Sequence, residues 1–240
     1  MPGPVAELGP LHRVDGSAAY SHAGYNVLGA VTGPVEAQRR DEIPDEAAVD
    51  VHVRPATGVG SIKERHLEAI VQSTLRHVIL VHQFPRSLVQ VSLQVLSVPD
   101  TSLMAVPLSS RLTTLALLPA LLQTAMHALL SAALPLSTTF TSTLVCVTRG
   151  ADGGGAIRAS PDPECLADAA SAHAVCYSAG GELLMDMSEG DFDVDEWDAA
   201  MGVGRRICCG EKGGRGGDAV MRDEESESLQ DKLRKLVAER

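Results

Sequence analysis

The sequence lacks an excess of basic residues. Its 240 residues include 20 Lys and Arg against 31 Asp and Glu, which gives a formal net charge of −11 at pH 7. Domains that coat nucleic acid through bulk charge are usually strongly basic, so this class of protein is excluded. The charge is nevertheless uneven, because residues 54–86 hold five basic and two acidic side chains and residues 182–240 hold nine and sixteen. A local basic patch on an acidic chain indicates binding in one defined groove.

Paired cysteines and targeting signals are also missing. The five cysteines are odd in number and contain no CxxC pair, which argues against a disulfide framework and a structural zinc site. The first residues show no basic stretch followed by an apolar run, so we expect an intracellular protein without a secretory signal. Polar residues and Pro119 interrupt the apolar stretch from Leu112 to Leu136, which predicts a buried helix and no membrane partner. We expect no metal ion or cofactor.

Alternating apolar residues predict strands at 25–36, 48–54 and 87–97. We expect the first two to form an antiparallel pair, with Gly33–Pro34 as the turn that closes the first. Ser61 stands three residues before Glu64, which is the spacing of a capping box and predicts the start of a helix there.

The second half of the chain predicts a helix at about 115–133, with Pro119 in its first turn. Strands are expected at 139–148, 172–178 and 182–187, followed by a short helix at 194–201. Asp191, Asp193 and Asp195 imitate the opening of an EF-hand loop, but the later ligand positions do not fit, so they predict a charged helix start.

Three segments together resemble the RNase PH family: residues 13–43, RVDGSAAYSHAGYNVLGAVTGPVEAQRRDEI, the basic stretch 54–86, and residues 87–97, SLVQVSLQVLS. The resemblance implies an α+β fold like that of ribosomal protein S5 domain 2, in which two βαβα halves pack mixed sheets against helices. It implies an RNase PH-like domain at 13–201, with an insertion at about 98–114 and a preceding extension at 1–12. A glycine-rich linker at 202–217 and a C-terminal helix or tail at 218–240 complete the expected organisation.

Active members of this family cut RNA from its 3′ end with phosphate. They bind the phosphate with a Thr-Arg pair at a helix start and a metal ion with two aspartates six residues apart. The match places Leu117 and Leu118 at the first pair of positions and Cys165 and Ser171 at the second. Leucine cannot hold phosphate, and a hard metal ion needs anionic oxygen ligands. The resemblance therefore implies a protein without catalytic residues.

Two alternatives stay open. Asp162 and Asp168 are also six residues apart, so a shift of three residues in the match would restore a metal site. The chain would then be an active phosphate-dependent 3′–5′ exoribonuclease, with Arg65 or Arg111 on the phosphate. The third possibility is an isolated protein-interaction module.

The resemblance also implies RNA-binding residues. Arg65 matches a position that faces the RNA path, although it could instead pair with Glu68 on a solvated helix face. Arg39 and Arg40 reach the channel mouth or belong to a solvated turn, and Arg76 completes the expected set.

The expected function is that of a non-catalytic subunit of the RNA exosome core ring, which supports assembly and RNA threading during 3′–5′ RNA processing. The expected partners are other RNase PH-like ring subunits, in a hetero-oligomer, and RNA. The expected location is the nucleus, with the nucleolus, and the cytoplasm.

Overall fold

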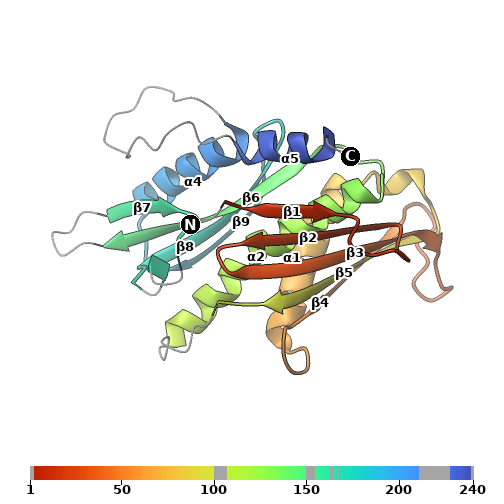
Figure 1. The fold of residues 1–240 in the computed structure, drawn as a ribbon, viewed down its shortest axis with the longest axis horizontal. Helices are drawn as coiled ribbons and strands as arrows, with labels where there is room; N and C mark the ends of the chain where they lie inside the picture. The colour runs from red at the N-terminus through yellow and green to blue at the C-terminus, as the bar shows by residue number, and fades with distance from the viewer. Residues whose placement is uncertain are drawn as a thin grey trace. The chain divides into compact units, whose positions relative to one another are not determined.

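The computed structural model describes residues 3–99, 107–149, 155–162, 165–166, 168–210 and 228–238. The chain divides into two compact units, Met1–Thr139 and Phe140–Arg240, and each contains one sheet and its helices (Figure 1). The split lies inside the single domain expected at 13–201.

The first unit contains a five-stranded sheet with the order β1-β2-β3-β5-β4. Its strands are β1 (Val5–Leu8), β2 (Gly16–His22), β3 (Tyr25–Glu36), β4 (Ala48–Arg54) and β5 (Ser87–Ser97). The prediction that β3 pairs with β4 is wrong, because β5 lies between them, antiparallel to β3 and parallel to β4. Helix α1 (Ile62–Val78) connects β4 to β5, and a helical crossover returns the chain parallel to the strand it left.

The N-terminal part of this sheet departs from the sequence prediction. β1 lies inside the expected extension at 1–12 and pairs with β2, so the sheet begins at Val5. Gly33–Pro34 is not a closing turn, because β3 continues to Glu36 and its pairing with β5 shifts between Thr32 and Val35. Such a shift is typical of a β-bulge.

Helix α1 begins as its sequence predicts. The Ser61 side chain accepts from the backbone of the first turn, and the Glu64 carboxylate accepts from Ser61 N at 2.7 Å, so both halves of the capping box are present. Leu67, Val71 and Leu75 are buried, since they recur on the helix face that packs on β4.

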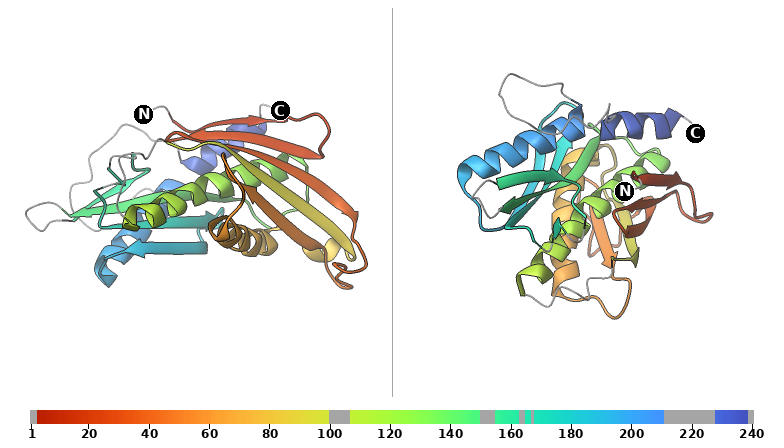
Figure 2. Two further views of the ribbon diagram at one scale, coloured as in Figure 1. Left: turned by 90° about the horizontal axis from the view of Figure 1, so that it is seen from below. Right: turned by 60° about the vertical axis from the view of Figure 1, so that its left-hand side comes forward.

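Helix α2 (Pro107–Ser131) begins eight residues before the predicted start and includes part of the expected insertion. Pro107 stands at its first position, where a missing amide costs little, and Pro119 therefore lies in the helix interior. The helix packs on β2 and β3, and Gly16 and Gly29 leave no room for a side chain against it. Figure 2 shows α1 and α2 on the same face of this sheet. Residues 114–131 are long and apolar enough for a membrane span, but most of them are buried, as in a core helix.

The second unit contains an antiparallel sheet with the order β7-β6-β8-β9. Its strands are β6 (Phe140–Arg149), β7 (Gly155–Ala159), β8 (Ser171–Ser178) and β9 (Leu183–Gly190). The predictions at 139–148, 172–178 and 182–187 fall on β6, β8 and β9, whereas β1, β2 and β7 had no predicted strand.

Two helices pack within this unit. α4 (Val194–Cys209) was predicted to end at 201, and it continues through eight residues assigned to the linker. The reason is its buried stripe, Ala200, Met201, Gly204 and Cys208, in which a side chain at Gly204 would collide with Val175. α5 (Leu229–Ala238) packs on α4 and β6. The rest of the expected linker, from residue 211, and the start of the tail lie outside the described residues.

Candidate functional site

The four arginines expected to bind RNA do not come together. Val53 N donates to Glu68 Oε1 at 2.8 Å and Gln72 Nε2 donates to Val49 O at 2.6 Å, so α1 runs antiparallel to β4. Arg65 therefore lies at the end of β4 that carries Arg54, and Arg76 lies at the opposite end. Eleven residues of helix separate Arg65 from Arg76 by about 16 Å.

The first end carries three exposed cations, although the Glu64 carboxylate also lies there and interacts with Lys63. Arg54, Lys63 and Arg65 are exposed, and within the described ranges no ion pair involves them. Glu68, the alternative partner of Arg65, instead accepts a hydrogen bond from the backbone N–H of Val53. The N-terminus of α1 adds a partial positive charge. We call Arg54, Lys63 and Arg65 the α1 basic end; a backbone phosphate of RNA could approach it.

The opposite end is largely neutralised. Arg40 pairs with Asp41 at 3.7 Å, Arg86 with Glu42 at 3.3 Å, and Arg76 with Glu46. Arg39 is exposed and belongs to no ion pair among the described residues. Of the predicted set, Arg65 and Arg39 thus retain an uncompensated charge.

The positions matched to the family's phosphate site are apolar and enclosed. Leu117 and Leu118 lie in the middle of α2, where Leu118 is fully buried and Leu117 partly so. The side chain of Arg111, the suggested replacement, lies outside the described part of the chain. Nothing at Leu117 or Leu118 can bind an anion.

The alternative aspartates form no evident metal site. Asp162 is half-buried and Asp168 is exposed, and in the part of the chain that the structure describes no three His, Cys, Asp or Glu residues gather as metal ligands. Cys165 accepts from Arg158 Nη1 at 3.3 Å, and Ser171 is buried in the core of its unit.

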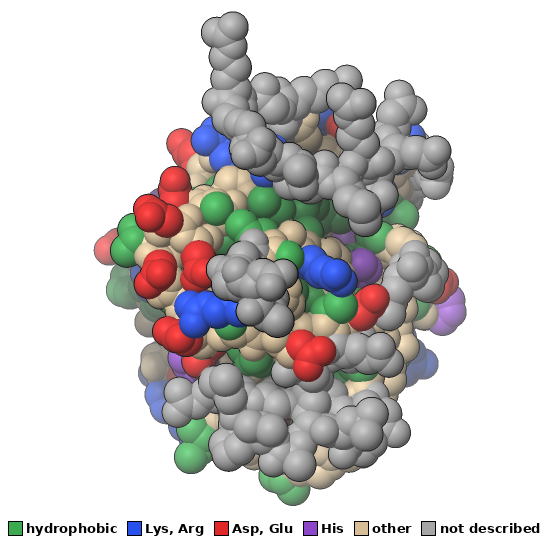
Figure 3. Space-filling model, turned by 90° about the vertical axis from the view of Figure 1, so that its left-hand side faces the viewer, with side chains coloured by type: hydrophobic (Ala, Val, Ile, Leu, Met, Phe, Trp, Pro, Cys, Tyr) green, Lys and Arg blue, Asp and Glu red, His purple; other side chains and the backbone are tan. Residues whose placement is uncertain are grey.

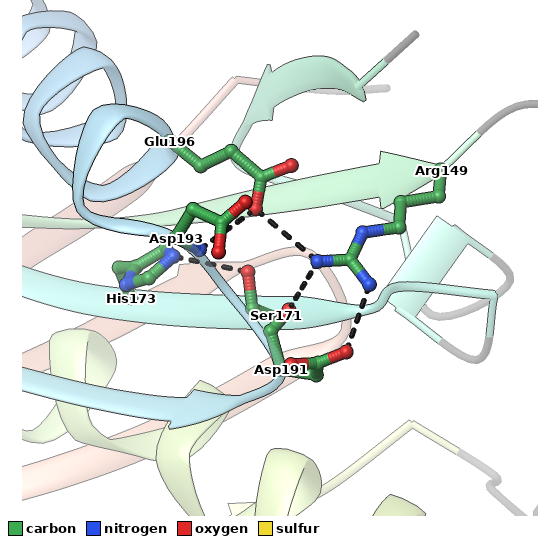
Figure 4. Close-up of polar contacts among 6 residues, drawn as sticks. All are labelled: Arg149, Ser171, His173, Asp191, Asp193 and Glu196. Atoms are coloured by element: carbon green, nitrogen blue, oxygen red, sulfur yellow. Dashed lines mark hydrogen bonds and ion pairs between the residues drawn. The ribbon is translucent and has the colours of Figure 1, made fainter. Parts of the chain in front are cut away.

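A polar cluster that the sequence did not predict lies at the end of β6 (Figure 4). Arg149 Nη1 lies 2.8 Å from Asp191 Oδ2, and Arg149 Nη2 lies 3.4 Å from Glu196 Oε2. The hydrogen bond to Asp191 is the main cause that raises the pKa of Arg149. Glu196 also accepts from Asp193 N at 3.1 Å in a capping box, so the predicted charged helix start is confirmed. Two carboxylates compensate this guanidinium, which leaves it poorly suited to hold a phosphate.

Behind this cluster, the ring of His173 is held on both sides. Its Nε2 lies 3.1 Å from Ser171 Oγ and its Nδ1 lies 2.8 Å from Ser188 Oγ, which donates to Asp186 Oδ1 at 3.1 Å. Burial lowers the pKa of His173, although Asp186 and Glu196 oppose the shift. Ser171 and His173 are both 0% exposed, so no substrate can reach this serine and the arrangement stabilises the fold.

Surface charge gives no broader basic area on the face drawn in Figure 3, where basic and acidic side chains of the described residues are interspersed. The α1 basic end is the candidate RNA contact because its three cations are exposed.

Comparison with known proteins identifies the family of this chain. Residues 5–135 match the model of the 3′ exoribonuclease family, domain 1, or RNase PH. The chain belongs to the RNase PH family. Its predicted fold class is confirmed, and the family match begins at the residue where β1 begins.

RNase PH relatives of this chain include exosome components. It is 30% identical to the exosome complex component RRP46 of Saccharomyces cerevisiae over 210 residues, which cover 85% of this chain and 89% of that protein. It is 33% identical to exosome complex component rrp46 of Schizosaccharomyces pombe over 98 residues, 41% of this chain and 43% of that protein.

Solved RNase PH-like structures share the fold. The crystal structure of rice (Oryza sativa) Rrp46 has a TM-score of 0.70 at 20% identity and covers 85% of this chain and 87% of its own. A chain of the Archaeoglobus fulgidus exosome with RNA bound to the active site has a TM-score of 0.64 at 14% identity, with coverage of 85% and 84%.

Proposed function

We propose that this chain is a non-catalytic RNase PH-like subunit of an RNA exosome core ring. The observation that carries the proposal is the match to the yeast exosome component RRP46, which extends over 89% of that protein. Its partners are then other RNase PH-like subunits in a hetero-oligomeric ring, and RNA. Its work is RNA processing and turnover, including that of ribosomal RNA, in the nucleus, with the nucleolus, and in the cytoplasm.

The absence of catalysis is supported by the positions matched to the phosphate site. Leu118 is fully buried and Leu117 partly so, and an anion there would lose its hydration without gaining a charged partner. Asp162 and Asp168 have no ion pair within the described part of the chain, and a metal site requires several converging oxygen ligands.

RNA guidance is supported by the α1 basic end. Arg54, Lys63 and Arg65 are exposed together at the start of α1, and phosphate contacts of this kind position a nucleic acid without reading its sequence. Three side chains suit a short contact with a passing strand better than high-affinity capture.

The test of inactivity is an assay of the complex purified through a tag on this chain, with the associated hydrolytic nuclease removed. The substrate is 3′-labelled RNA, with and without inorganic phosphate. We expect no phosphate-dependent release of nucleoside diphosphates, and release that is lost in an Asp168→Ala variant would overturn the proposal.

One observation favours a second candidate, an active phosphate-dependent 3′–5′ exoribonuclease. Relatives in Oryza sativa subsp. japonica and Arabidopsis thaliana are called exosome complex exonuclease RRP46 homolog, at 35% and 31% identity over 86 and 85 residues. The matched part is 36% of each plant protein. Asp162 and Asp168 would be the metal ligands in this case, and the phosphate assay separates the two candidates.

A further inference from the structure

The two sheets end in four edge strands, which differ in how their unpaired backbone groups are protected. An edge strand presents a row of N–H and C=O groups that can pair with another chain, unless it is short or covered. β1 and β7 are short, with 4 and 5 residues. β4 is longer, but α1 side chains occupy two of its backbone groups: Gln72 Nε2 donates to Val49 O, and Glu68 Oε1 accepts from Val53 N.

β9 is not short, and no α-helix side chain among the described residues occupies its backbone groups as in β4. It is 8 residues long and pairs with β8 along one edge, and no strand among the described residues pairs with its other edge. No described side chain is seen to bond to the backbone of residues 183–188.

The side chains of β9 also suit a partner. Leu183 is 45% exposed and Leu184, Met185 and Met187 are partly exposed. Methionine side chains adapt their shape to what they contact. Asp186 in β9 and Glu182 just before it are exposed and favour a partner that carries basic residues.

We infer that β9 is a docking edge that receives an extended segment of a neighbouring ring subunit, rich in alternating apolar residues and flanked by basic ones, as a fifth strand of this sheet. The inference rests on the proposed membership of an exosome ring. The unpaired backbone groups select a strand as the occupant, because main-chain hydrogen bonds supply the affinity in this mode of recognition and alternate side chains supply the specificity.

The register shows which side chains the added strand would cover. Met185 and Met187 pair with Cys176 and Ala174, so they share one face of the sheet, whereas Asp186 and Ser188 lie on the face of Val175 and His173. Asp186 is already held by Ser188 Oγ and by Trp197 Nε1 at 3.3 Å. The carboxylate is therefore oriented before a basic partner arrives.

Amide hydrogen exchange tests this directly, on the free full-length chain and on the chain in its purified ring complex. We expect amides along β9 to exchange at least tenfold more slowly in the complex, with little change along β4. A ring complex in which β9 exchanges at the same rate as in the free chain would overturn the inference and leave the proposed function intact. Failure to recover any ring subunit would overturn both.

A double variant gives an independent readout. Leu183→Lys with Met187→Lys removes two apolar contacts and adds positive charge, which would repel a basic partner segment docked on this edge, so we expect at least tenfold less recovery of the neighbouring subunit. Val237→Lys on α5 is the matched control, because Val237 is 42% exposed, and it should not change recovery. Circular dichroism establishes that both variants are folded. Equal recovery by the folded double variant and the control would contradict the docking edge.

Discussion

Arg65 shows at the scale of single residues how the structure separates arginines that look alike in sequence. Arg65 and Arg76 lie on the same helix, but Arg76 is paired with Glu46, whereas Glu68, the alternative partner of Arg65, bonds to the backbone of Val53. An uncompensated guanidinium attracts phosphate more strongly than one beside a carboxylate.

We therefore expect Arg65→Ala, in the assembled complex, to weaken binding of single-stranded RNA roughly threefold to tenfold. The slope of log affinity against log salt should fall by about 0.7, because one phosphate contact is lost. Arg76→Ala is the matched control and should change the affinity less than Arg65→Ala does. Equal losses in the two variants, measured by a salt titration of binding, would show that the α1 basic end has no special role.

His173 provides a test at low pH. Burial lowers its pKa, so below the ordinary value of about 6.5 the unfolded chain binds a proton that the folded chain does not. The contribution of His173 to the free energy of unfolding should be complete above pH 6.5 and should decrease as the pH falls below that value. Burial also lowers the pKa of His127, which adds a change of the same sign.

The contribution of His173 can be isolated with His173→Asn. We expect this variant to be less stable at pH 7.5 and to lose less stability than the unaltered chain between pH 7.5 and 5. Denaturant unfolding at several pH values measures both. An unchanged pH dependence would mean that His173 takes up a proton in the folded state.

At the scale of elements, close contact between β2 and α2 is the feature that the sequence could not reveal. A side chain at Gly16 would overlap the backbone of Ala128 in α2 and of Ala132 just after it, so the glycine is required by a neighbour more than 100 residues away in the chain. No local pattern marks such a position, and β2 itself, GSAAYSH, carries few apolar residues that would predict a strand.

Gly16→Ala should accordingly destabilise the protein by about 1–3 kcal/mol, the usual cost of overpacking. Gly60→Ala is the matched control, since nothing lies within 4 Å of its added methyl group, and it should cause no loss. Thermal and denaturant unfolding distinguish the two. Similar stability of both variants would mean that β2 and α2 are not in close contact.

The errors at helix ends have related causes. The predicted start of α2 is too late because the prediction puts Pro119 in the first turn, whereas Pro107 occupies that place. The predicted end of α4 is too early because the prediction assigns Gly202 and Gly204 to a linker, whereas Gly204 packs closely against Val175. In both cases tertiary packing outweighed the local preference of proline or glycine.

At the scale of the whole molecule, the fold class followed from sequence because strong local signals agreed with one another. The strand at β5, the capping box of α1 and the family-like segments all indicate the same fold class, and the family match over residues 5–135 supports that class. The order of the strands could not be predicted from the sequence, because the pairing of β4 with β5 depends on the path of α1 and not on the strand sequences.

The candidate site could be predicted only in part. Sequence spacing placed Arg65 on a helix start, but it could not show that Arg39, Arg40 and Arg76 lie at the other end of α1. The sequence does not reveal the cluster around Arg149 because its members come from β6, from the segment before α4 and from the first turn of α4, and Arg149 and Asp191 are 42 positions apart.

Membership of a hetero-oligomeric ring is the central claim, and native mass spectrometry of the complex purified through a tag on this chain from its own cells tests it most directly. We predict one copy of this chain in each complex, together with several different RNase PH-like subunits. A monomer, or an oligomer that contains this chain alone, would contradict the proposed function.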